Sequence, residues 1–176
     1  RRTMRQAGVP VVPGSDGPTA DLAAVEAVAR EGGYPILLKA AAGGGGRGMR
    51  LVEAAEALAP AFEAARRESE AAFGDGRLYA EKYLTGAKHI EVQVACDRQG
   101  HCVHLGERDC SLQRRHQKVL EETPCRRLPE ALRQTVCAAA VSAAQAVGYE
   151  GVGTVEFLVT PEGDWYFMEM NTRLQV

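Results

Sequence analysis

The sequence predicts an α+β fold, in which helices and mainly antiparallel strands alternate irregularly. Helix-type segments surround short apolar strands in the first half of the chain, whereas strand-type runs dominate the second half. Several of those runs are joined by short turns, which is typical of hairpins. A regular βαβ series would need a long crossover between successive strands, so a simple parallel sheet is not expected.

The segment PGSDGP at 13–18 is rich in turn residues and predicts a linker. Residues 21–33 then place apolar side chains at helical spacing and end in Gly-Gly, which is a typical stop. Asp21 lies where the N-cap of this helix is expected.

Two short apolar strands are expected at 34–40 and 49–52, on either side of the loop GGGGRG. An alanine-rich helix is expected from about 53 to 73. Pro60 fits that helix only if it lies in the first turn or if the helix restarts there, because proline lacks a backbone N–H.

The second half of the chain is predicted to be mostly antiparallel sheet. The polar and aperiodic segment 107–125 fits neither a helix nor a strand and is interpreted as a long loop. Gly148 is expected to stop the only long helix in this half. The expected elements are strands at 77–84, 89–97, 102–109, 153–160 and 165–173, and a helix at 129–148.

The composition is that of an ordinary globular chain, with 176 residues, 45% hydrophobic and 25% charged. The net charge of -2 and the pI near 6.1 argue against nucleic acid or an anionic membrane as a partner. No apolar run approaches the roughly 20 residues of a membrane span. We expect a soluble, internal protein of a bacterial cytoplasm, with the mitochondrial matrix as the alternative.

The cysteines are odd in number and contain no CxxC pair, so we predict that they are reduced and structural rather than a disulfide or zinc framework. Two nearby histidines without further spaced ligands do not make a metal site. The five cysteines are Cys96, Cys102, Cys110, Cys125 and Cys137.

The glycine run after Lys39 leaves backbone amides free to approach an anion, because no side chains stand in the way. A flexible linker is the plain alternative. The loop does not match the Walker pattern, since no Lys-Ser/Thr follows its last glycine. Lys39 adds a positive charge at the same place, and the two features together favour phosphate binding.

The C-terminal hairpin is predicted to bring two acids face to face. If PEGD is a four-residue loop, Thr160 pairs with Trp165 and Glu156 lies opposite Glu169. Like charges about 5 Å apart repel by roughly 3 kcal/mol at an effective dielectric of 20. A shared proton, an arginine or a divalent cation could offset this, and Mg²⁺ or Mn²⁺ would do so best, with Asn171 adding an oxygen. A solvent-facing polar strand is the alternative.

The segment ERDCSLQRRHQK gathers basic side chains into one short stretch. Such a run is usually a solvated face. Beside paired glutamates and a glycine loop with a lysine, however, it fits a nucleotide-dependent phosphoryl or acyl-phosphate step, which needs charge neutralisation on phosphates. The basic residues are Arg108, Arg114, Arg115, His116 and Lys118.

An ordered series of segments closely resembles the biotin carboxylase component of biotin-dependent carboxylases, an ATP-grasp family. The segments are KAAAGGGGRGM, EKYL, HIEVQV, ERDCSLQRRHQK, GTVEFL and EMNTRLQV. The resemblance covers almost the whole chain and implies an α+β lid and a larger body that bind MgATP between them. By this resemblance, residues 1–15 are a linker from a preceding domain, 16–84 the lid subdomain and 85–176 the first part of the body.

The resemblance implies that MgATP activates bicarbonate as carboxyphosphate, whose CO₂ is transferred to biotin. It assigns Lys39, Gly45 and Gly46 to the phosphates. Further nucleotide contacts are implied for Glu81, Lys82, Tyr83 and Leu84 at the adenine hinge. His89 and Gln113 would face the ribose and nearby groups, and His116 is a further expected nucleotide-binding residue.

The resemblance also implies a metal site and a bicarbonate pocket. Glu156, Glu169 and Asn171 correspond to the metal ligands, in agreement with the hairpin register. The pocket is formed by Lys118, Arg173, Gln175 and the backbone at Val176. Among these, Lys118 and Arg173 are the expected catalytic residues, and Arg173 would stabilise the reacting anion.

Two departures from the family are visible. Ala41 and Ala42 replace a Ser-Gly that many relatives carry, which puts the kinetics of the lid in doubt. The glutamate that follows Gln-Val in the family, its proposed base, is absent, so we expect a fragment that is inactive alone. The form EMNTR favours the acyl-CoA carboxylase branch.

The partners implied by the resemblance are a biotin carboxyl carrier domain and a carboxyltransferase, within a homo-oligomer. Two other functions remain open. One is another ligase that forms carboxyphosphate, such as a carbamoyl-phosphate synthetase half. The other is a nucleotide-binding module without catalysis.

Overall fold

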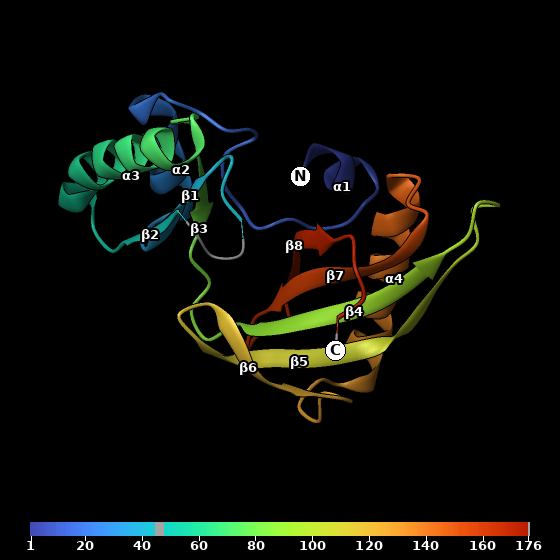
Figure 1. Cartoon of the computed structure of the whole chain (residues 1–176). Coiled ribbons are helices and arrows are strands. Elements are labelled where there is room, and N and C mark those ends of the chain that lie inside the picture. Colours follow the sequence, from blue (N-terminus) through green and yellow to red (C-terminus); the bar gives the residue numbers. More distant parts are fainter. Residues whose placement is uncertain (45–47, 176) are drawn as a thin grey trace. The chain divides into compact units, whose positions relative to one another are not determined.

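The computed structural model describes residues 1–44 and 48–175, and the chain divides into two compact units. The larger unit comprises Arg1–Val11, Leu84–Arg114 and Lys118–Val176, and the smaller unit comprises Val12–Tyr83 and Arg115–Gln117. Each unit contains its own antiparallel sheet (Figure 1). The domain boundaries inferred from the resemblance stay a prediction.

The smaller unit is a three-stranded sheet with two helices packed against it (Figure 1). The strand order is β2-β1-β3, and both pairings are antiparallel. The elements are α2 (Leu22–Gly32), β1 (Ile36–Ala40), β2 (Met49–Val52), the short 3-10 helix η1 (Ala55–Ala57), α3 (Leu58–Phe73) and β3 (Leu78–Lys82).

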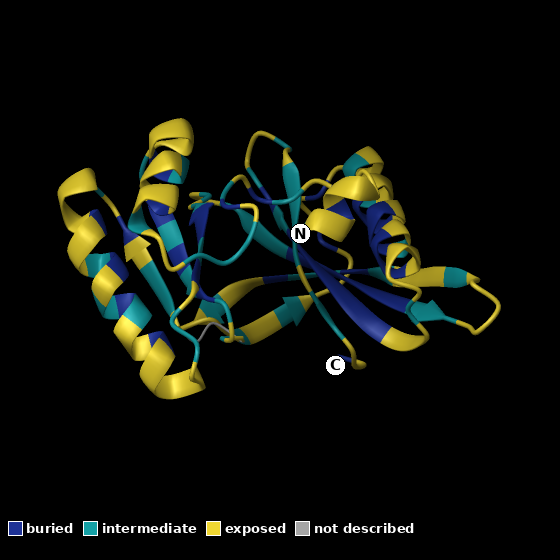
Figure 2. Ribbon diagram, turned by 90° about the horizontal axis from the view of Figure 1, so that it is seen from above, coloured by how far each residue is buried: buried dark blue, intermediate teal, exposed yellow. Residues whose placement is uncertain are grey.

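Both helices of the smaller unit are buried along one side and exposed along the other (Figure 2). Val25 and Ala29 of α2 and Phe62 and Ala65 of α3 join the apolar strand residues in one core. This is the arrangement that apolar residues at helical spacing predict. Burial of this stripe, more than helix propensity, holds the two helices in place.

The starts of these helices follow the expected chemistry. The Asp21 side chain accepts a hydrogen bond from the Ala23 backbone N–H at 2.9 Å, so the predicted N-cap is confirmed. Pro60 is the third residue of α3 and therefore lies in its first turn, where its missing N–H has no helical partner to lose. None of the described helices is long and apolar enough to cross a membrane.

The larger unit is a five-stranded sheet of order β6-β5-β4-β7-β8, with α4 packed mainly over β4 and β5. Each of the β4–β5, β4–β7 and β7–β8 pairings is antiparallel. The elements are α1 (Arg2–Gln6), β4 (Lys88–Cys96), β5 (Cys102–Arg114), β6 (Gln117–Glu122), α4 (Glu130–Ala146), β7 (Gly151–Val159) and β8 (Trp165–Asn171).

The central strands of this sheet have one apolar face and one polar face. In β4, alternate residues Ile90, Val92 and Val94 enter the core that also contains the buried face of α4. The residues between them point to the other side of the sheet, because side chains alternate along a strand. The core under the sheet thus fixes the positions of the polar side chains above it.

The segment 107–125, expected to be a loop, instead contains most of a hairpin formed by β5 and β6. The two-residue turn is Arg115-His116, and both residues have positive φ, 51° and 65°, as tight hairpin turns require. The sequence interpretation was wrong because both faces of β5 carry charged residues. Glu107 contacts Arg133 of α4 and Arg108 contacts Glu91 on the opposite face, so no apolar alternation is visible.

The C-terminal hairpin confirms the predicted pairing of Glu156 with Glu169 but reaches it differently. Val159, not Thr160, is the partner of Trp165. The register then shifts between Glu156 and Phe157, which leaves Met168 as one extra residue in β8. This bulge returns the two acids to opposite positions.

The prediction that all cysteines are reduced was wrong for one pair. Cys96 and Cys102 form a disulfide and are directly opposite each other in the β4–β5 ladder, with Cα atoms 4.0 Å apart. They form a non-hydrogen-bonded pair of the ladder next to the turn, and in such pairs the facing side chains are closest together. A search for CxxC spacing does not detect this arrangement. The other three cysteines are free and buried, as predicted.

Candidate functional site

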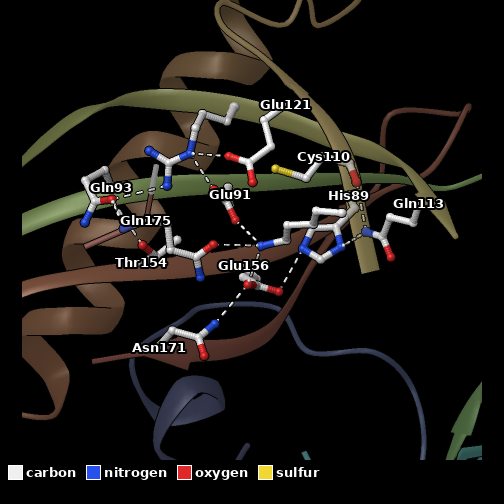
Figure 3. Close-up of polar contacts among 12 residues, drawn as sticks. His89, Glu91, Gln93, Cys110, Gln113, Glu121, Thr154, Glu156, Asn171 and Gln175 are labelled. Carbon is white, nitrogen blue, oxygen red and sulfur yellow. Dashed lines mark hydrogen bonds and ion pairs between the residues drawn. The ribbon is translucent and has the colours of Figure 1, made fainter. Parts of the chain in front are cut away.

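Three glutamates form one row across the polar face of the sheet in the larger unit. Glu91 of β4 is paired with Glu156 of β7, which is paired with Glu169 of β8. Glu91 and Glu156 are 0% and 4% exposed, whereas Glu169 is exposed. Cross-strand neighbours lie about 5 Å apart at Cβ, so these carboxylates need positive charge between them. Figure 3 shows Glu91 and Glu156 within one polar cluster.

Lys118 of β6 lies between the first two acids. Its Nζ contacts Glu91 Oε2, lies 2.9 Å from Glu156 Oε1 and donates to Gln175 Oε1 at 3.1 Å. Burial alone would lower the pKa of Lys118, but the hydrogen bonds to Glu91 and Glu156 outweigh it and raise the pKa. The lysine therefore stays charged and joins two strands of the sheet to the C-terminal segment.

Arg108 of β5 neutralises the other side of Glu91. Its Nε contacts Glu91 Oε1 and lies 3.7 Å from Glu121 Oε2, and its Nη2 donates to Gln93 Oε1 at 3.2 Å. The thiol of Cys110 lies close to the same carboxylates, and its pKa rises to about 12, first through burial and then through the charge of Glu91. Cys110 is therefore a neutral thiol at physiological pH.

His89 links the row to β5 in a defined tautomer. The Gln113 amide nitrogen donates to the Cys110 carbonyl at 2.8 Å and lies 2.8 Å from His89 Nδ1. Nδ1 is thus the acceptor, which leaves the proton on Nε2, 2.8 Å from Glu156 Oε2. Burial would raise the pKa of Glu156, but His89 and Lys118 outweigh it, and the pKa falls to about 2.

The side of the row toward Glu169 differs from the side toward Glu91. Asn171 Nδ2 donates to Glu156 Oε1 at 2.9 Å, which brings an amide side chain of β8 to this carboxylate. Among the described ion pairs and hydrogen bonds, none involves Glu169. Lys118 and Arg108 therefore balance the buried end of the row, whereas no side-chain cation among the described ion pairs contacts Glu169 at its exposed end.

Two further groups of possible metal ligands lie within this cluster. One is His89 with Glu91 and Glu156, and the other is Glu91 with Cys110 and Glu121. Lys118 or Arg108 already contacts the carboxylates at the centre of both groups. Both carboxylate oxygens of Glu91, the residue that the two groups share, thus already contact side-chain cations, so Glu91 belongs to an ion-pair network and neither group is assigned as a metal site.

The segment that follows β8 is tied back to the sheet through its backbone. The Thr154 hydroxyl lies 3.3 Å from the Arg173 carbonyl oxygen, and the Gln175 N–H donates to Gln93 Oε1 at 3.3 Å. The Arg173 residue itself is exposed. These contacts place Gln175 beside Lys118, so the structure brings together two of the expected bicarbonate ligands.

The expected nucleotide residues fall into both units. In the smaller unit, Lys39 forms an ion pair with Glu81, and Lys82 Nζ donates to the carbonyls of Gly33 and Tyr34 at 3.2 and 3.0 Å. Tyr83 ends that unit and Leu84 opens the next part of the larger one. His116 is exposed in the β5–β6 turn. Gly45, Gly46 and Val176 lie outside the described residues.

Three residues at the centre of the cluster were not assigned a role from the residues alone: Glu91, Gln93 and Thr154. A signal for the first two was present, since HIEVQV alternates strictly and places His89, Glu91 and Gln93 on one face of a strand. Thr154 carries no such signal. Its contribution depends on the pairing of β7 with β4, which single-strand periodicity does not reveal.

This arrangement combines buried ionised acids, a fixed ammonium group and an exposed acid next to an amide, which suits a site for a cation and an anionic substrate. The class is defined by the match of residues 1–176 to the family model described as carbamoyl-phosphate synthase L chain, ATP binding domain. The chain belongs to this family, and its fold is that of an ATP-grasp domain.

Within this class, the curated relatives are carboxylase components. The chain is 55% identical over 174 residues to the biotin carboxylase of Pseudomonas aeruginosa, covering 98% of this chain and 38% of the relative. It is 53% identical over 173 residues to the mitochondrial methylcrotonoyl-CoA carboxylase subunit alpha of Dictyostelium discoideum, covering 98% of this chain and 25% of the relative. The chain therefore spans well under half the length of either protein.

Solved structures agree with these relatives. A biotin carboxylase from Campylobacter jejuni, described as a β,γ-ATP complex, matches with a TM-score of 0.95 and 56% identity over 99% of this chain and 39% of that one. The biotin carboxylase domain dimer of a 2-oxoglutarate carboxylase from Hydrogenobacter thermophilus matches with a TM-score of 0.93 and 49% identity, over 99% of this chain and 39% of that one. That structure contains MgADP, ADP and bicarbonate.

Proposed function

We propose that this chain is the ATP-binding core of a biotin carboxylase, which uses MgATP and bicarbonate to carboxylate biotin. The observation that carries the proposal is the side chain of Gln175, which is 8% exposed. Its Nε2 has no hydrogen-bond partner among the described residues, while its Oε1 accepts from Lys118 at 3.1 Å. An unsatisfied buried amide costs about 1–3 kcal/mol unless a ligand pairs with it. A small anion such as bicarbonate would accept from both the amide and the ammonium.

Glu156, Glu169 and Asn171 are proposed to hold Mg²⁺ or Mn²⁺. Their fit is supported by the donor set, because all three offer the oxygen atoms that these hard cations prefer. The low pKa of Glu156, about 2, keeps this ligand ionised at neutral pH. When bound, the ion neutralises charge on the phosphates of ATP. Glu91 remains paired with Lys118 and Arg108 and is not assigned as a ligand.

Lys118 and Arg173 are proposed to hold the reacting anion, together with Gln175 and the backbone at Val176. The nucleotide contacts proposed for the smaller unit are Lys39, Gly45 and Gly46 at the phosphates and Glu81, Lys82 and Tyr83 at the adenine, followed by Leu84. His89 and Gln113 are proposed to face the ribose and nearby groups, and His116 is proposed as a further nucleotide-binding residue. His89 also fixes Glu156, so a change at His89 would disturb the metal ligand as well.

The whole enzyme is proposed to transfer its product to a biotin carboxyl carrier domain and a carboxyltransferase of an acyl-CoA carboxylase. The form EMNTR and the methylcrotonoyl-CoA carboxylase relative support this branch. The pyruvate carboxylase of Bacillus subtilis, 52% identical over 176 residues, represents the competing branch. A homo-oligomer is proposed from the domain dimer in the Hydrogenobacter structure, and a bacterial cytoplasm from the composition.

A carbamoyl-phosphate synthetase half is a second candidate, since the family model bears that description. Both enzymes would form carboxyphosphate from ATP and bicarbonate. They differ in the acceptor, which is biotin in one case and ammonia in the other.

The test uses the full-length parent protein and measures bicarbonate-dependent ATP hydrolysis with free biotin or with ammonia. We expect stimulation by biotin and none by ammonia. Stimulation by ammonia alone would assign the second candidate, and the absence of any bicarbonate-dependent hydrolysis would refute both. Glu169→Gln should abolish Mg²⁺-dependent turnover, because one metal ligand loses its charge.

Glu162→Gln is the matched control, since Glu162 is an exposed glutamate in the turn of the same hairpin. This variant should keep the turnover of the parent protein. Calorimetric titration with Mg²⁺ and ADP should show weaker metal-dependent binding for Glu169→Gln only. A near-normal rate in Glu169→Gln would show that the metal site lies elsewhere.

A further inference from the structure

Gln93 is a buried amide at the centre of the polar cluster, and all of its polar atoms are used. The residue is 3% exposed. Its Nε2 donates to the Gly153 carbonyl at 2.6 Å, and its Oε1 accepts from Arg108 Nη2 at 3.2 Å and from the Gln175 N–H at 3.3 Å. The Thr154 hydroxyl lies a further 3.2 Å from the same oxygen. Figure 3 shows Gln93, Thr154 and Gln175 side by side.

The orientation of this amide is fixed by its neighbours. Gly153 presents a carbonyl, which needs the NH₂ group, whereas Arg108 and the Gln175 N–H are donors, which need the oxygen. In the flipped orientation the amide would lose these hydrogen bonds. Its oxygen would then face the Gly153 carbonyl oxygen, and its NH₂ group would face the N–H donors of Arg108 and Gln175. Gln93 therefore has one stable orientation, and its oxygen points toward the segment after β8.

Through these contacts Gln93 joins three parts of the proposed anion site. It reaches the guanidinium of Arg108, which balances Glu91 and so supports Lys118 indirectly. It also reaches the backbone of Gln175, whose side chain contacts Lys118. The adjacent Thr154 hydroxyl lies 3.3 Å from the carbonyl of Arg173. Among the described hydrogen bonds, those of no other side chain join both Arg108 and the backbone of Gln175.

We propose that Gln93 is a positioning residue for the anion site: it holds the backbone of residues 173–175 so that Arg173 and Gln175 face Lys118. Gln93 acts through other groups and does not itself contact the substrate. The inference rests on the proposed function, because the anion concerned is bicarbonate. A variant that removes the polar atoms of Gln93 should therefore use bicarbonate less well while its use of ATP changes little. The reason is that other residues are expected to contact the adenine and the phosphates.

The test is Gln93→Met in the full-length parent protein, which keeps the length of the side chain and removes its polar atoms. We expect the KM for bicarbonate to rise about tenfold and the KM for ATP to change less than twofold. Hydrogen exchange of peptides covering residues 170–175 should become faster. Gln145→Met is the matched control, because Gln145 is an exposed glutamine of α4 whose side chain has one described hydrogen bond, to the Gly100 carbonyl at 3.3 Å.

Thr154→Val is the second variant and keeps the inference testable if Gln93→Met fails to fold. It removes a single hydroxyl and should raise the KM for bicarbonate by a smaller factor, about threefold, with the KM for ATP unchanged. Equal increases in both KM values, or unchanged exchange at 170–175, would overturn the positioning role. A wild-type parent without bicarbonate-dependent hydrolysis would instead refute the proposed function, so the two failures are distinct.

Discussion

At the scale of single residues, the larger unit keeps its acids charged by giving each buried one a fixed partner. Glu91 and Glu156 share Lys118, and Glu107 accepts from Arg133 and from the Cys125 N–H, both at 2.9 Å. A buried ion pair is costly to break, because removal of one partner leaves an uncompensated charge. These ion pairs therefore help to specify how the strands and α4 are aligned with one another, in addition to any net stability that they add.

Asp109 gives a pH-dependent example of such a pair. Its carboxylate contacts the Lys88 ammonium and accepts from the Ser111 N–H at 3.0 Å. Burial would raise its pKa, but Lys88 and Ser111 outweigh it, so the pKa falls from its ordinary value of 3.8 to about 2. A lowered pKa stabilises the fold above the ordinary value, and this contribution is lost as the pH falls from 3.8 toward 2.

We therefore expect Asp109→Asn to lower the free energy of unfolding by on the order of 2 kcal/mol at pH 7. The difference from wild type should shrink as the pH is lowered from about 5 toward 2, because the carboxylate of the unfolded state, with its ordinary pKa of 3.8, is protonated first and that of the folded state only near pH 2. Urea unfolding at a series of pH values measures this. A difference that stayed constant with pH would mean that the charge of Asp109 does not contribute.

At the scale of the elements, close backbone contacts set limits that side-chain patterns do not show. Gly14 forms an isolated bridge with Glu81 of β3, and a Cβ at this glycine would lie 2.2 Å from the Ala80 carbonyl oxygen. The neighbour is backbone within a strand, so it cannot move aside cheaply. This explains why a segment that the sequence indicates as a simple linker is tied to the sheet.

Gly14→Ala is expected to destabilise the smaller unit by about 3 kcal/mol, at the upper end of the usual cost of overpacking. Gly17→Ala is the control, because a Cβ at Gly17 meets no atom within 4 Å. Its effect should lie within about 0.5 kcal/mol of zero. Thermal or urea unfolding of both variants measures the contrast, and equal stability of the two would contradict the close approach.

The elements that the sequence predicts well are those whose apolar core residues follow a clear period. Helix α2 and strand β7 follow a clear period, and Asp21 caps its helix by a local rule. The β5–β6 hairpin was missed because its buried residues are charged and paired with residues far away in the sequence, such as Glu107 with Arg133. Its Arg-His turn also lacks the usual Asn-Gly signal.

For the site, sequence reasoning reached the pairing of Glu156 with Glu169 but not that of Glu156 with Glu91. The first pairing belongs to a hairpin, whose register is nearly local, whereas the second joins β4 to β7 across the 64 intervening residues 92–155. The resemblance supplied Lys118 and Gln175. It did not supply the contacts through which Gln93 connects them, since these depend on the orientation of one amide.

At the scale of the whole molecule, the two units have separate apolar cores. Phe62 belongs to the core of the smaller unit and is 1% exposed, and Phe157 belongs to the core of the larger unit and is 0% exposed. Phe157 also makes edge-to-face contacts with Trp165 and Phe167. No buried residue is shared between these two described clusters.

Phe62→Ala and Phe157→Ala should each cost about 3–5 kcal/mol of stability within their own unit. Hydrogen exchange measured by peptide should become faster in α2, α3 and β1 for the first variant, and in β4, β7 and α4 for the second. Phe73→Ala is the control, because Phe73 is 37% exposed, and it should change little. Faster exchange throughout the chain in either variant would contradict separate cores.

The extra residue Met168 has a consequence for the alignment of the hairpin. A four-residue turn without a bulge and a five-residue turn with a bulge both place Glu156 opposite Glu169. Both arrangements contain the same twelve residues between the acids, 157–168, so one residue can belong either to the turn or to the strand while the acids stay opposite each other. The alignment of the two acids therefore does not depend on a single turn geometry.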